Sequence, residues 1–109
     1  MSNQKDIVLI PFPYSDLSTM KKRPALIISN EKMRGEDFIC CLVTSKPHKD
    51  DLQISKEFFG EGTLPFKSFV KPHRIFTIHK GVIIKKLCTI KKEFHNSVVE
   101  KINKYLKSD

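Results

Sequence analysis

The sequence predicts a mainly β protein: a small closed or nearly closed barrel with one C-terminal α-helix. Three observations support this. The chain has 109 residues, its apolar residues fall into about five to seven short runs rich in β-branched side chains, and helical spacing occurs only near the C-terminal end. A chain of this length makes one domain, which we place at residues 1–109. Closing the sheet into a barrel also removes its exposed edges.

The first three strands are predicted in the N-terminal half. Residues 7–10 (Ile-Val-Leu-Ile) form a strand-like run that we expect to end at residues 11–13, Pro-Phe-Pro, because proline interrupts strand pairing. The polar segment 14–22 is expected to be a loop. Residues 25–29 and 38–43 then predict two further strands of buried type, the second of which ends at a threonine.

The C-terminal half predicts shorter strands followed by a helix. Residues 52–54 predict a short strand, and residues 68–71 and 74–78 predict two more, separated by Pro72. A helix is expected over residues 91–107, because apolar residues recur at every fourth position there: Ile90, Phe94, Val98, Ile102 and Leu106. The lysine-rich opposite side of this helix is typical of a solvated face.

Composition excludes several classes of protein. The longest apolar runs are about six residues, far below the roughly 20 needed for a membrane-spanning helix, and the N-terminus lacks the features of a signal peptide. We therefore expect a cytoplasmic protein with no membrane segment. The three cysteines, Cys40, Cys41 and Cys88, predict buried reduced thiols rather than disulfides, and the spacing of the Cys and His residues predicts no zinc site.

The charge balance favours an anionic partner. Lys and Arg number 20 against 12 Asp and Glu, which gives a net charge of +8 and a pI of about 9.5. Such an excess attracts nucleic-acid phosphates but specifies neither a base nor a reaction.

Four segments carry a resemblance to a known family. Residues 6–16 (DIVLIPFPYSD) and 21–29 (KKRPALIIS) look like the opening of the PemK/MazF toxins of type II toxin–antitoxin systems. Residues 38–45 (FICCLVTS) resemble the family's strand that ends in Thr or Ser, and residues 68–78 (SFVKPHRIFTI) resemble a later Ser-x-Val strand. The motifs occur in the expected order over nearly the whole chain.

The resemblance implies a fold and a function. The fold is an SH3-like or CcdB-like barrel, usually a homodimer. The function is that of an mRNA interferase, a sequence-selective endoribonuclease that cleaves single-stranded RNA without a metal or other cofactor and is neutralised by a cognate antitoxin. Its products carry 2′,3′-cyclic phosphate and 5′-OH ends. Two alternatives remain open: a non-catalytic toxin-like barrel that binds nucleic acid or a protein partner, and a gyrase-poisoning mode.

The resemblance also implies catalytic residues. Arg23 falls on the arginine of the family's Arg-Pro motif, and a planar guanidinium suits bidentate contact with a dianionic transition state. Thr44 falls on the strand-end threonine, and Ser45, which follows it, is expected to bind RNA. His73 stands where relatives carry an acidic residue, so we expect histidine to be the general base here. Lys71 stands where some relatives have arginine and is expected to bind phosphate.

An RNA-binding groove is expected between residues 14–22 and residues 46–51. Tyr14 is predicted to stack on unpaired bases, whereas Phe12 is better explained as a core residue. The lysines expected to follow the phosphates are Lys21, Lys22, Lys46 and Lys49.

Overall fold

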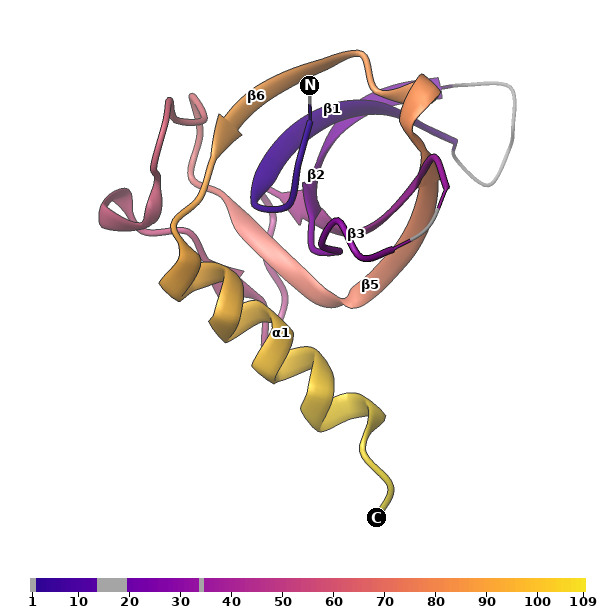
Figure 1. The fold of residues 1–109 in the computed structure, drawn as a ribbon. Coiled ribbons are helices and arrows are strands. Elements are labelled where there is room, and N and C mark those ends of the chain that lie inside the picture. The colour runs from indigo at the N-terminus through magenta and orange to yellow at the C-terminus, as the bar shows by residue number, and fades with distance from the viewer. Residues whose placement is uncertain (1, 14–19, 34) are drawn as a thin grey trace.

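A computed structural model describes residues 2–13, 20–33 and 35–109 (Figure 1). In these ranges six strands form one antiparallel sheet in the order β4-β5-β3-β2-β1-β6. The sheet curls into a half-barrel, with a C-terminal helix beside it (Figure 1). The elements are β1 (Asp6–Pro13), β2 (Met20–Ile27), β3 (Asp37–Thr44), β4 (Leu52–Gln53), the 3-10 turn η1 (Lys56–Phe58), β5 (Phe69–His79), the 3-10 turn η2 (Lys80–Val82), β6 (Lys85–Thr89) and α1 (Lys92–Leu106).

The prediction that β1 ends before its prolines was wrong. The strand continues through Pro13, with Pro11 opposite Lys22 and Pro13 opposite Met20. On its other side β1 pairs with β6 only over residues 6–9. The prolines therefore lie where the strand has a single paired neighbour, which is where a missing N–H is tolerated. The same pairing makes Lys21 and Lys22 strand residues rather than loop residues.

The two strands predicted on either side of Pro72 are one strand. In the pairing of β5 with β3, Lys71 lies opposite Leu42 and Ile75 lies opposite Cys41. Residues 72–74 of β5 therefore form a bulge between two adjacent residues of β3. Proline fits there because a bulged residue leaves the hydrogen-bonded ladder, and a bulge bends its strand.

Apolar side chains cover both faces of the sheet. Ile7 and Leu26 belong to a core cluster that α1 completes, whereas their neighbours Val8 and Ala25 belong to a second cluster on the other face. Since successive strand residues point to opposite faces, a sheet buried on both sides has continuous apolar strands. This explains the unbroken apolar runs of the sequence.

The structure confirms the predicted C-terminal helix and the predicted buried thiols. α1 buries Phe94, Val98 and Ile102 on one face, although Leu106, at the end of the same spacing, is 71% exposed. The three cysteines are buried free thiols, and burial raises the pKa of Cys40 and Cys41 to about 12 and that of Cys88 to about 11. None of the helices described has the length and apolarity to cross a bilayer.

Candidate functional site

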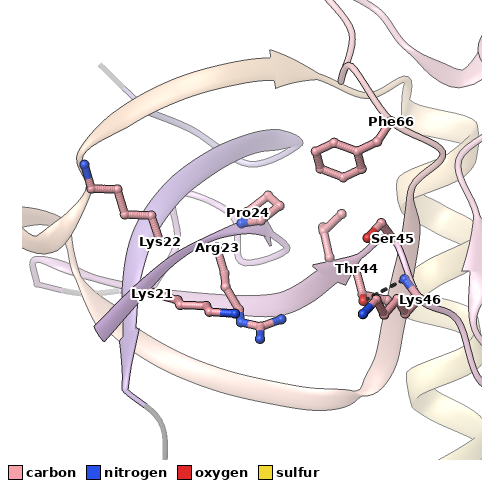
Figure 2. A pocket seen from close by; sticks show the side chains of 9 residues that line it. Lys21, Lys22, Arg23, Pro24, Thr44, Ser45, Lys46 and Phe66 are labelled. Atoms are coloured by element: carbon pink, nitrogen blue, oxygen red, sulfur yellow. Dashed lines mark hydrogen bonds between the residues drawn. The ribbon is translucent and has the colours of Figure 1, made fainter. Parts of the chain in front are cut away.

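Strand pairing brings Arg23 and Thr44 to one end of the sheet. Ala25 of β2 lies opposite Leu42 of β3, and the strands are antiparallel. Arg23, two residues before Ala25, and Thr44, two residues after Leu42, therefore lie at the same end of the two strands. Both residues line a pocket of about 270 Å³ (Figure 2), whose walls are formed by Lys21, Lys22, Arg23, Pro24, Val43, Thr44, Ser45, Lys46 and Phe66.

The pocket is strongly basic. Four of its described lining residues are cations and none is a carboxylate. Lys21, Lys22 and Lys46 are exposed. Arg23 is partly buried and comes two residues before the buried part of β2. A concave, positively charged surface concentrates anions near it.

The hydroxyl of Thr44 shapes one wall of the pocket. Its Oγ1 accepts a hydrogen bond from the backbone N–H of Lys46 at 3.1 Å (Figure 2). This turn fixes the chain as it leaves β3. Because the oxygen serves as acceptor in this bond, the hydroxyl hydrogen can be donated to a ligand in the pocket.

A buried ion pair anchors the loop that continues from this wall. Lys71 of β5, only 7% exposed, donates from Nζ to Oδ2 of Asp51 at 2.8 Å. The same oxygen accepts from the backbone N–H of His48 at 2.8 Å, and Nδ1 of His48 lies 2.9 Å from the ammonium. Because an ammonium only donates, Nδ1 is the acceptor in this contact. The loop is thus held to β5 at two of its residues.

The pKa of Asp51 reflects competing effects. Burial of the carboxyl, whose side chain is fully buried, by itself raises the pKa. The hydrogen bonds from His48 and Lys71, the charge of Lys71 and the nearby His73 outweigh burial and lower it. Within the described part of the chain, the second carboxyl oxygen, Oδ1, is buried without a hydrogen-bond partner.

Other residues singled out in the sequence lie elsewhere. Lys71 does not line the pocket, and a role in holding phosphate would require its ammonium to leave Asp51. His73 is exposed in the β5 bulge, near Asp51 but not among the pocket residues. Tyr14 lies outside the described residues. Phe12 packs edge-to-face on Phe76 with ring centroids 5.5 Å apart, as predicted for a core residue.

Sequence reasoning missed two features of this region. Phe66 lines the pocket, and its only signal in the sequence is an aromatic residue within a loop between Pro65 and Lys67. The partnership of Asp51 with Lys71 had no local signal. Among the described residues, no group of three or more His, Cys, Asp or Glu side chains could hold a metal ion.

Comparison with known proteins identifies the family. The family described as PemK-like, MazF-like toxin of type II toxin–antitoxin system matches residues 3–106. The chain belongs to this family. No curated protein matches it in sequence.

Solved structures share the fold of this chain. An endoribonuclease in complex with its cognate antitoxin, from a mycobacterial species, superposes with a TM-score of 0.74 at 15% identity, covering 96% of this chain and 92% of that one. MazE–MazF (Form-III) from Deinococcus radiodurans superposes with a TM-score of 0.69 at 19% identity, covering 96% and 95%. At these identities the likeness establishes the MazF-type fold of the chain.

Proposed function

We propose that this PemK/MazF-family chain is a sequence-selective endoribonuclease toxin that cleaves single-stranded RNA without a metal ion. The observation that carries the proposal is the pocket, which places the arginine of the family's Arg-Pro motif beside the strand-end threonine and three exposed lysines. The similar mycobacterial structures are endoribonucleases, which supports the same reaction here.

The proposed reaction is attack by a ribose 2′-hydroxyl on the adjacent phosphorus. The bond from 2′-oxygen to phosphorus forms as the bond to the 5′-oxygen breaks, so the products are a 2′,3′-cyclic phosphate and a 5′-OH. A base takes the 2′-OH proton, and a proton reaches the leaving 5′-oxygen. Arg23 would hold the doubly charged phosphorane through its planar guanidinium, and the Thr44 hydroxyl would donate to a phosphate oxygen.

His73 remains our proposed base. The family resemblance aligns it with an acidic residue of relatives, and its exposed imidazole lies on the β5 bulge, where its charge acts on the carboxylate of Asp51. RNA that enters the pocket must extend toward the bulge for the ribose to reach this imidazole.

A second function is favoured by one observation. Since His73 does not line the pocket, a chain that binds RNA at Arg23 without cleaving it would have the same geometry. The proposed partners are single-stranded RNA in the pocket, a cognate antitoxin whose acidic segment covers the cations, and a second copy of the chain in a homodimer.

The two functions are separated by one experiment. The purified protein is incubated with a long single-stranded RNA in excess EDTA, and the ends of the fragments are mapped. We expect fragments with 2′,3′-cyclic phosphate and 5′-OH ends at a restricted set of sequences. A matched RNA with 2′-deoxyribose at a mapped site should resist cleavage at that site. Binding without cleavage would favour the non-catalytic alternative, and cleavage that EDTA abolishes would overturn the metal-independent mechanism.

A further inference from the structure

Phe66 is an exposed aromatic side chain inside a basic pocket. Six of the eight phenylalanines pack into the two core clusters, but Phe66 does not and is 41% exposed. It lines the same pocket as Arg23 and Lys46. In the view of Figure 2 its ring lies on one side of Pro24 and the Arg23 guanidinium lies on the other. The pocket therefore combines an aromatic face with cations.

The backbone that carries this ring is anchored on both sides. Leu64, two residues earlier, packs against the core cluster beneath α1. Two residues later the buried Ser68 donates from Oγ to the carbonyl of Phe66 at 2.8 Å, and the carbonyl of Ser68 accepts from the N–H of Ile54 at 2.9 Å. Pro65 fixes the backbone angle φ directly before the ring. A backbone anchored in this way reduces the conformational entropy that the segment loses when the ring binds a ligand.

We propose that Phe66 is a stacking platform for one base of the RNA, next to the phosphate held by Arg23. This proposal rests on the proposed function and adds a base-binding subsite to it. Proteins that bind single-stranded nucleic acid combine aromatic faces for the bases with cations for the backbone, and both occur here in one pocket. Because a base and its phosphate are joined through one ribose, a strand with its phosphate at Arg23 brings a neighbouring base to the ring.

The dimensions and lining of the pocket favour a nucleotide over an apolar protein side chain. A volume of about 270 Å³ lies just below the roughly 300–1,000 Å³ typical of small-ligand sites, so the pocket can admit part of a nucleotide strand. Its apolar surface consists of Phe66, Pro24 and Val43 among four cations, an arrangement that binds a flat ring carrying an anion.

The test is a double-mutant cycle on binding. The RNA is a short single strand that the parent binds, with 2′-deoxyribose at any site that the parent cleaves. A series of strands carries one abasic ribose at each position in turn. Phe66→Ala should weaken binding of the intact strand about 5- to 150-fold, and Phe66→Trp should retain it. Removal of the base that stacks on Phe66 should weaken binding to the parent by a similar factor. The same abasic strand should bind Phe66→Ala almost as well as the intact strand binds Phe66→Ala. Tyr105→Ala, which removes a similarly exposed aromatic side chain on α1 (46% exposed), should bind like the parent.

The outcomes distinguish this proposal from the proposed function. Cleavage of the all-ribose strand by the parent tests the function, whereas binding of the 2′-deoxy strand tests the subsite. If each abasic strand loses the same factor with the parent and with Phe66→Ala, no base stacks on the ring and the subsite is overturned. If Phe66→Ala binds RNA as the parent does, the proposal also fails, and the ring is left as a contact for a protein partner. Thermal unfolding of Phe66→Ala at the parent's temperature would confirm that the fold is unchanged.

Discussion

Two groups of basic side chains lie near the ends of neighbouring strands, but their surroundings are opposite. The pocket lysines Lys21, Lys22 and Lys46 are exposed, whereas Lys71 is buried with its ammonium against the carboxylate of Asp51. Each of these four lysines contributes one positive charge to the net charge of +8, whether it is exposed or buried. A basic excess therefore shows that an anion would be attracted, but only exposure shows which cations can meet it.

The protein has a second hollow that is larger than the basic pocket but differs from it in charge. A hollow of about 840 Å³ lies away from the pocket and is roughly three times larger. Its described lining mixes charges: Lys5 and Lys80 with Glu31, Glu36 and Asp37. Mixed charge gives no net attraction for a polyanion, so the smaller, basic pocket is the better RNA site.

The largest effect is expected from Lys71→Met. The substitution leaves the Asp51 carboxylate buried without its counter-charge, which typically costs about 3–5 kcal/mol of folding stability. Urea unfolding should show a much lower midpoint. Lys46→Met, at an exposed position, should stay within about 0.5 kcal/mol of the parent. Equal midpoints for the two variants would remove the distinction between the two groups of cations.

Arg23→Ala is expected to affect RNA cleavage most strongly, whereas Lys71→Met is expected to affect folding stability. Loss of a group that stabilises charge in the transition state should slow RNA cleavage roughly 100- to 1000-fold, or about 2.7–4 kcal/mol by analogy with an oxyanion donor. Any loss of folding stability must be measured separately, because Arg23 is partly buried. Initial rates on single-stranded RNA and thermal unfolding measure the two effects. A variant that cleaves as fast as the parent would exclude Arg23 from catalysis.

His73→Gln tests whether the base lies outside the pocket. Loss of a general base should slow cleavage by about 100-fold, the lower end of the range for such groups, and should flatten the acid limb of the pH–rate profile. His73→Asp should retain activity and move that limb to lower pH, because a carboxylate stays ionised in more acidic solution. The measurement is single-turnover cleavage of a short RNA between pH 4 and 9. A parental profile for His73→Gln would make His73 a bystander.

The buried ion pair also predicts how stability depends on acid. The pKa of Asp51 is lowered below its usual value of 3.8 in the folded protein. The unfolded chain therefore takes up a proton first as the pH falls. The stability contributed by Asp51 is complete above the unfolded pKa and is lost as the pH falls through the folded pKa. Urea midpoints measured from pH 6 down to pH 2.5 should fall less steeply for Asp51→Asn than for the parent.

The smallest effect is expected from Lys46→Ala. If Lys46 contacts one phosphate, its loss should weaken RNA binding a few-fold and reduce the slope of log K against log salt by about 0.7. Lys104→Ala, at an exposed position on α1, is the matched control and should leave the slope unchanged. The measurement is binding of a non-cleavable strand at several salt concentrations. Equal slopes for both variants would show that position in the pocket confers no advantage over general charge.

The sequence alone predicted five of the six described strands, the helix, and Arg23 and Thr44 of the pocket, but it missed β6 (Lys85–Thr89) and the full extent of β1 and β5. Apolar periodicity is local, so it predicted the strand from Asp37 to Thr44 and the helix from Lys92 to Leu106 within one residue at each end. Motif resemblance selected Arg23 and Thr44, and the antiparallel pairing of their strands brought them together.

Tertiary structure decided what depends on distant neighbours. Pro11 and Pro13 stay in β1 because β6 leaves that stretch of strand with one partner, and β5 crosses Pro72 because the bulge absorbs it. Lys71 is buried because its ammonium pairs with Asp51, which is 20 residues away in the sequence. Phe66 lines the pocket from a loop that follows β4 and η1. Such contacts join segments far apart in the chain, and local residue patterns carry no record of which segments meet.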